Sequence, residues 1–172
     1  MEAIQQSIIT WLTGVFGENA RELVALFVSM IPILELRAGL PLAVGLGLKL
    51  WVALPICIIG NLIPVPFILW LITPIFNALK RTKLFRPMVE KLEKRAMSKS
   101  DKIEKGYFWG LVLFVGIPLP GTGAWTGSLI AALLGIPPKK ALPAVALGVL
   151  LAAAIMTVLS VAFGAALFGI QI

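Results

Sequence analysis

The chain has 172 residues, of which 59% are hydrophobic and only 13% are charged, with no histidine and a single cysteine. A soluble domain carries about 25% charged residues, so this composition indicates an integral membrane protein. The absence of histidine excludes histidine-based acid–base catalysis, a Ser-His triad and most zinc sites, and one cysteine cannot form an intramolecular disulfide. We therefore expect no enzymatic activity, no cofactor, no metal site and no catalytic residues.

The net charge of +7 is concentrated in one segment, because ten of the 15 lysines and arginines lie between Lys80 and Lys105. A basic chain can bind nucleic acid, but a basic loop between apolar segments is better explained by the positive-inside rule. We therefore expect loop 80–105 to be cytoplasmic and expect no nucleic-acid partner.

The N-terminal stretch, residues 3–17, is uncharged and mostly apolar. Fifteen helical residues reach about 22 Å, which is less than the hydrocarbon core of about 30 Å. We expect an interfacial or partly inserted helix within residues 1–22, and whether it spans the membrane is left open. No basic segment precedes it, so the stretch does not resemble a signal peptide.

Two short apolar runs follow, Leu23–Leu34 and Ala38–Leu48, and Glu35 and Arg37 lie between them. Each run is too short to cross a bilayer, and prolines break the helix close to the two charges. This pattern predicts a re-entrant hairpin. Its non-helical tip has to be buried in protein or face water.

The segment Leu50–Leu79 has 30 uncharged residues, which is enough to span a membrane with some tilt. Four prolines predict that this span is kinked. Trp51 and Trp70 fit either the two membrane interfaces or core packing.

Within loop 80–105, apolar residues recur at helical spacing, Pro87 suits a first helical turn, and Glu90 and Lys94 are four residues apart. We expect an amphipathic helix on the cytoplasmic surface, with a solvated helical linker as the alternative. The apolar positions are Phe85, Met88, Val89, Leu92 and Ala96.

The second uncharged stretch, Gly106–Pro138, is too long for one crossing and is divided by a Pro-Gly-rich break, which predicts a second hairpin. The final span is Ala141–Ile172. Its small residues Ala144, Gly148 and Ala152 form a face for close helix packing, either within the chain or between copies.

The two halves are similar in order: a short arm, a proline break, a glycine-rich arm and a long span. Aligning Ile31-Pro32 with Ile117-Pro118, with a two-residue insertion, matches Gly39 with Gly127, Gly47 with Gly135 and Gly60 with Gly148. If both hairpins return to the side they entered, 12 of the 15 basic residues share one side and the two spans run in opposite directions. We therefore expect an all-α integral membrane protein with one membrane domain, 1–172, in which 23–79 and 106–172 are inverted repeats.

Glu35 and Arg37 are the strongest functional candidates, since charges at membrane depth are costly and mark pathways or sites. Glu35 would carry a proton, and Arg37 would bind an anionic group or keep Glu35 ionised. The alternative is a structural ion pair at the hairpin tip. Because residues two apart do not share a helix face, such a pair requires a broken backbone. Pro41 closes this first motif.

The break in the second hairpin is the other candidate. Its glycines allow close backbone approach, and a helix starting near Thr122 would direct N–H groups at an anion. The alternative is a tight turn, with Trp125 packed on the opposite hairpin. Asn61 is interpreted as a helix–helix contact more readily than as a ligand. The residues of this second motif are Pro118, Pro120, Gly121, Thr122, Gly123 and Trp125.

The stretches from Glu35 to Pro41 and from Pro118 to Gly127 resemble the signature motifs of the bacterial and archaeal small multidrug export protein family, and the resemblance extends from about Glu22 to the last span. That family is similar to the DedA/VTT superfamily, which implies two inverted re-entrant hairpins, lipid movement and proton-dependent transport. Glu35 would match the acidic residue of the first hairpin. The arginine that DedA proteins carry in the second hairpin is absent here.

We therefore expect a small secondary transporter or lipid translocase, proton-coupled, in a prokaryotic inner membrane, with its site between the two hairpin tips. The alternatives are a membrane scramblase and a structural or assembly factor without coupled transport. The expected partners are membrane lipids, protons and an anionic lipid or small-molecule substrate. Homo-oligomerisation is left open.

Overall fold

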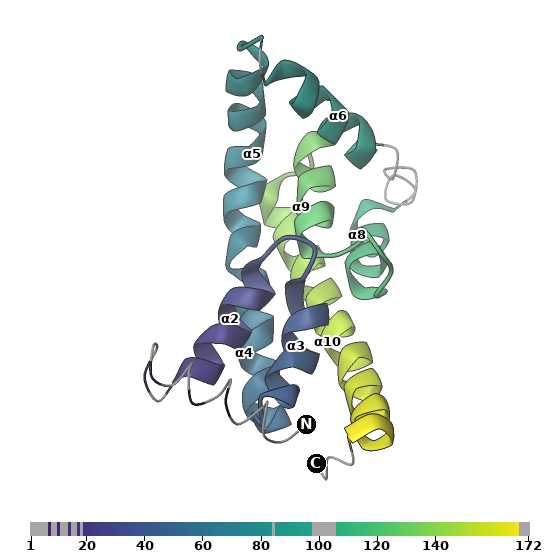
Figure 1. Cartoon of the computed structure of the whole chain (residues 1–172). Coiled ribbons are helices and arrows are strands. Elements are labelled where there is room, and N and C mark those ends of the chain that lie inside the picture. The colour runs from purple at the N-terminus through teal and green to yellow at the C-terminus, as the bar shows by residue number, and fades with distance from the viewer. Residues whose placement is uncertain are drawn as a thin grey trace. The chain divides into compact units, whose positions relative to one another are not determined.

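The computed structural model describes residues 7, 10, 14, 17, 19–83, 85–97 and 106–168, and every regular element in these ranges is a helix (Figure 1). The N-terminal helix expected over residues 3–17 falls outside the continuous described ranges. The helices are α2 (Ala20–Met30), α3 (Glu35–Gly45), α4 (Leu50–Leu62), α5 (Pro64–Lys80), α6 (Arg86–Met97), α8 (Tyr107–Gly116), α9 (Ala124–Leu133) and α10 (Pro138–Phe168).

Two helical segments are long and apolar enough to cross a membrane, Leu50–Lys80 and Pro138–Ser160. The first of them consists of α4 and α5, which are separated by a turn at Ile63, and Pro64 takes the first position of α5. Proline suits that position because the first N–H groups of a helix have no partner within the helix. The helix is therefore interrupted within this span at one of its four prolines, and the kink itself stays a prediction. Trp51 and Trp70 are both exposed, which excludes core packing for them.

The chain divides into two compact units. Unit 1 comprises residues 1–61 and 153–172, and unit 2 comprises residues 62–152. Each unit contains one helical hairpin.

The hairpin of unit 1 is formed by α2 and α3, which lie side by side (Figure 1). Each has 11 residues and is therefore about 16 Å long, roughly half a hydrocarbon core. Gly47, with φ +84°, ends α3 through two hydrogen bonds, from Gly47 N–H to Val44 O and from Leu48 N–H to Ala43 O. This is a Schellman C-cap, in which glycine accepts the left-handed conformation without strain.

Ser29 of α2 is the point at which three helices of unit 1 approach closely. A Cβ atom on Gly39 of α3 would lie 2.0 Å from Ser29 Oγ, and a Cβ on Gly60 of α4 would lie 2.6 Å from Leu26 O and 3.0 Å from Ser29 Cβ. The buried Ser29 hydroxyl donates to Ala25 O at 2.8 Å, so its polar group is satisfied inside its own helix. Glycine at both positions therefore allows α3 and α4 to pack directly on α2.

The hairpin of unit 2, formed by α8 and α9, has the same local design. Each helix has 10 residues, and Gly135, with φ +68°, ends α9 with the bonds Gly135 N–H to Ala132 O and Ile136 N–H to Ala131 O. At the open end of this hairpin, Lys140 Nζ of α10 lies 5.7 Å from the ring centre of Tyr107, the first residue of α8.

Val115 of α8 takes the place in unit 2 that Ser29 has in unit 1. A Cβ on Gly127 of α9 would lie 2.6 Å from Val115 Cγ2, and a Cβ on Gly148 of α10 would lie 2.6 Å from Val115 Cβ and 2.9 Å from Val112 O. The alignment made from sequence pairs Ser29 with Val115 and Leu26 with Val112, so equivalent glycines meet equivalent positions. The small-residue face of α10 makes its close contact at Gly148 within the chain.

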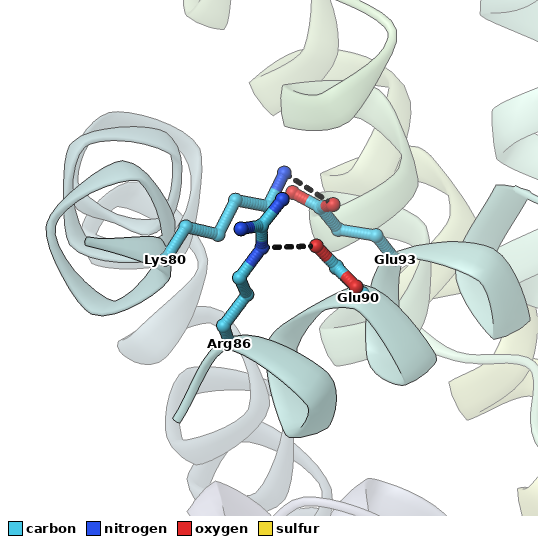
Figure 2. A network of polar contacts seen from close by, with 4 residues as sticks. All are labelled: Lys80, Arg86, Glu90 and Glu93. Atoms are coloured by element: carbon cyan, nitrogen blue, oxygen red, sulfur yellow. Dashed lines mark hydrogen bonds and ion pairs between the residues drawn. The ribbon is translucent and has the colours of Figure 1, made fainter. Parts of the chain in front are cut away.

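The basic segment contains a helix, as predicted, although its charges pair differently from the expectation. Figure 2 shows that Glu90 accepts a 2.8 Å hydrogen bond from Arg86 Nε, one turn earlier, whereas the sequence spacing suggested Lys94. A guanidinium N–H directed at a carboxylate makes a charge-assisted hydrogen bond. Glu93 pairs with Lys80 at the end of α5.

We expect Gly60→Ala and Gly148→Ala to destabilise the protein by about 1–3 kcal/mol relative to Gly45→Ala, because the added Cβ would displace a backbone carbonyl of the neighbouring helix. Gly45 is the matched control, since a Cβ there meets nothing within 4 Å. Cys57 is fully buried and is the only cysteine, so a thiol-reactive fluorogenic dye reports unfolding on heating. Equal transition temperatures for the three variants would contradict the close-contact interpretation.

Candidate functional site

The tip of the first hairpin is a strained, non-helical turn. Residues 31–34 separate α2 from α3, and Pro32 prevents the helix from continuing. Ile33 has φ +78° and Glu35 has φ +50°, both in the left-handed region. For a β-branched residue this is a genuine outlier, and each such conformation costs on the order of 1–3 kcal/mol. Such strain persists only where the surrounding structure enforces it.

Glu35 is the first residue of α3 and is only 3% exposed, while Arg37 is half-buried. The charges of Glu35 and Arg37 attract one another. The left-handed backbone at Glu35 supplies the break that an interaction between residues two apart requires. The carboxylate also lies in the first turn of α3, where the helix dipole favours a negative charge.

Around the buried Glu35, the tip exposes apolar side chains and backbone N–H groups that make no hydrogen bond to the described residues. Ile31, Ile33 and Leu34 are exposed, and Ile33 reaches 93%. The N–H groups of Ile33 and Leu34 have no hydrogen-bond partner among the described residues. An unsatisfied N–H in hydrocarbon costs several kcal/mol. The tip therefore suits water, or a ligand that combines an apolar body with an acceptor oxygen.

The tip of the second hairpin is held together by Thr122. Its hydroxyl donates to Leu119 O at 2.8 Å and to Ile117 O at 3.0 Å, and its N–H donates to Leu119 O at 3.2 Å. Gly121, at φ +74°, and Gly123, at φ +128°, take conformations that side chains resist. The hydroxyl of Thr122 thus forms hydrogen bonds within its own loop.

Helix α9 begins at Ala124, two residues later than expected, and its N-cap is Gly123, which has no side chain to cap it. Gly127 N–H donates to Gly123 O at 2.8 Å, which closes the first turn. Trp125 lies half-buried in that turn. The positive end of the α9 dipole therefore lies at the loop, and the binding of an anion there stays a prediction.

The structure divides the predicted site residues into two groups. Glu35, Arg37 and the exposed Pro41 belong to α3 in unit 1. The others lie in unit 2, in the loop before α9 or in its first turn: Pro118, Pro120, Gly121, Thr122, Gly123 and Trp125. That the two tips together form one site stays a prediction.

Sequence reasoning missed two features of the buried polar residues. The first is the central position of Ser29, which the spacing between the matched glycines and the proline breaks could have indicated. The second is that Asn61 Oδ1 and Ser128 Oγ are buried without a hydrogen-bond partner in the described part of the chain, although Asn61 was expected to bond across helices. Both residues directly follow a close-contact glycine. Nowhere in the described ranges do three His, Cys, Asp or Glu side chains gather as a metal site would require.

Two long apolar helices, two half-length hairpins with proline breaks and a buried acid at one break define a helical membrane protein. The chain belongs to the family described as "Putative small multi-drug export protein", whose model matches residues 35–155. The match begins at Glu35 and includes the second break. No curated protein and no solved structure matches the chain. The resemblance to this family is therefore confirmed, and the relation to the DedA/VTT superfamily stays a prediction.

We expect Thr122→Val to lower stability by about 0.5–1.5 kcal/mol, because two loop carbonyls lose their donor, and Thr122→Ser to retain it. The unmasking of Cys57 on heating measures both variants. A Thr122→Val protein as stable as wild type would show that the hydroxyl does not hold the loop.

Proposed function

We propose that this membrane protein is a small secondary transporter in which Glu35 carries a proton and Arg37 binds the anionic group of the substrate. The observation that carries the proposal is the burial of Glu35 beside Arg37 at a strained break in a half-length apolar hairpin. Membership of a multidrug export family supports transport in general. The proton coupling and the roles of Glu35 and Arg37 belong to our proposal and are not given by the family.

Burying the charges of Glu35 and Arg37 has an energetic cost. Removing two ions from water costs several kcal/mol each after relaxation, and an ion pair is often no more stabilising than apolar residues of equal volume. A hairpin that needed only a tight tip could use glycine and a hydroxyl, as the second hairpin does with Gly121 and Thr122. The charges in the first hairpin therefore favour a role in moving protons or anions.

The chemistry of the tip suggests the substrate class. Exposed Ile31, Ile33 and Leu34 surround two N–H groups without partners, and a guanidinium lies within the first turn of α3. These groups suit an anion with an apolar body, such as an anionic lipid or an amphiphilic small molecule. We therefore propose lipid translocation as the more specific activity, and no enzymatic step is part of it.

The proposed architecture is a pair of inverted repeats with re-entrant hairpins in a prokaryotic inner membrane. Equivalent glycines pack on equivalent positions in the two units, and the Schellman caps at Gly47 and Gly135 are alike, which supports the repeat. The contact of Lys140 with Tyr107 supports a hairpin that returns to its entry side. The positive-inside rule then makes residues 80–105 cytoplasmic.

A second candidate is a passive scramblase or an assembly factor, in which Glu35 and Arg37 only stabilise the tip. Their mutual attraction favours this alternative. The two candidates differ in what happens when both charges are removed together.

We expect Glu35→Gln and Arg37→Ala to abolish proton-driven flux while the protein stays folded. The assay is uptake or efflux in proteoliposomes with an imposed proton gradient, with a fluorescent lipid phosphate and a cationic dye as parallel probes. Glu22→Gln, an acid-to-amide change in the first turn of α2, is the matched control and should transport normally.

The double variant Glu35→Gln/Arg37→Gln separates the candidates, since it removes both charges without leaving one of them unpaired. Transport should remain absent if the charges carry protons and substrate. Restored transport in the double variant, after loss in each single variant, would establish a structural ion pair and contradict the proposal.

A further inference from the structure

The apolar positions of α6 do not form one buried face. In the sequence Phe85, Met88, Val89 and Leu92 belong to a single helical stripe, but only Val89 is buried, at 0% exposure. Phe85, Met88 and Leu92 are 41–50% exposed. They occupy adjacent turns on one side of the helix, by the spacing i, i+3 and i+7. About half of each side chain of this exposed apolar ridge is therefore left uncovered.

The rotation of α6 about its axis is set by the contacts of Val89 and Glu93, which lie next to the ridge. Helix α6 packs on α5 and α9, all within unit 2, and Val89 faces that contact. The ion pair between Glu93 and Lys80, the last residue of α5, joins the same side of α6 to the end of the membrane span (Figure 2). At 100° per residue, the ridge lies beside Val89 on the flank opposite Glu93, and its side chains are about half exposed there.

The charges at this corner leave several basic side chains of the described residues without an acidic partner, and one of them, Lys91, lies beside the ridge. Both acids of α6 are used in ion pairs, Glu90 with Arg86 and Glu93 with Lys80. Four exposed basic residues then have no acidic partner in the described part of the chain: Arg81, Lys83, Lys91 and Lys94. At 100° per residue, Lys91 flanks the ridge on the side of Met88, away from the two acids.

The occupant of this surface follows from its position and chemistry. Helix α5 ends the apolar segment Leu50–Lys80, so the corner at Lys80 marks the membrane surface. Apolar side chains flanked by lysine and arginine suit a layer with acyl chains below and negative phosphates above. We propose that α6 is a binding surface for anionic lipid, with Phe85, Met88 and Leu92 inserted among acyl chains and Lys83 and Lys91 bound to headgroup phosphates. This site is separate from the proposed transport site at Glu35.

The test uses the full chain in vesicles, with single cysteines introduced into a Cys57→Ala background and labelled with bimane. The positions are Met88→Cys and Leu92→Cys on the ridge and Lys94→Cys on the opposite side of α6. The control for background labelling is the wild-type chain, because its only thiol, that of Cys57, is buried. Quenching is measured with brominated phosphatidylcholine or brominated phosphatidylglycerol in the same lipid mixture, and with aqueous iodide.

We expect brominated lipid to quench labels at 88 and 92 several-fold more than the label at 94, and iodide to show the reverse order. Brominated phosphatidylglycerol should quench more strongly than brominated phosphatidylcholine at equal content. That preference should be lost in Lys83→Gln/Lys91→Gln, while quenching by both lipids persists.

Three outcomes would overturn the proposal. Iodide quenching of positions 88 and 92 equal to that at 94 would make α6 a solvated helix. Disulfide-linked dimers through Met88→Cys, without lipid quenching, would place a second copy on the ridge. Equal quenching by the two brominated lipids would leave an apolar membrane contact without anionic-lipid binding.

Discussion

The packing of this protein depends on four glycines that let helices touch without intervening side chains. Gly39 and Gly60 close on Ser29 in one unit, and Gly127 and Gly148 close on Val115 in the other. Helices in lipid gain no hydrophobic stabilisation from association, so van der Waals contact at small residues has to hold them together. In each unit these contacts fix the two hairpin arms against each other and against a neighbouring helix, α4 or α10. They therefore also fix the position of the hairpin tip within its unit.

The two tips solve the problem of a broken helix in different ways. At the second, glycines at left-handed φ and the Thr122 hydroxyl satisfy the loop from within. At the first, Ile33 and Glu35 take similar conformations without being glycine, and backbone N–H groups stay unbonded within the described structure. The second tip thus contains hydrogen bonds of its own that hold its loop, whereas two N–H groups of the first tip have no partner among the described residues. This difference, together with the buried charge of Glu35, is the basis on which we propose a function for the first hairpin.

Most of the fold was predictable because membrane helices follow simple rules of length and proline position. The hairpin arms, the interruption of the first span and the glycine alignment followed from runs of uncharged residues and from Pro32, Pro64 and Pro118. The partner of Glu90 and the start of α9 at Ala124 depend on local geometry that spacing alone does not encode. Likewise, periodicity grouped Val89 with Met88, whereas tertiary contacts separate them. For the site, composition identified Glu35 and Arg37, but the strain at Ile33 has no sequence signal.

That strain has a consequence for how far the protein can be stabilised. A glycine at position 33 would adopt φ +78° freely, so relieving the strain is open to a single substitution. Natural proteins commonly lack stability that a single substitution could add, and adding it costs function where activity needs a strained site. If turnover depends on the left-handed conformation at Ile33, greater rigidity at this turn would lower it. A variant engineered for higher thermal stability at this turn would be the one in which loss of activity is most informative.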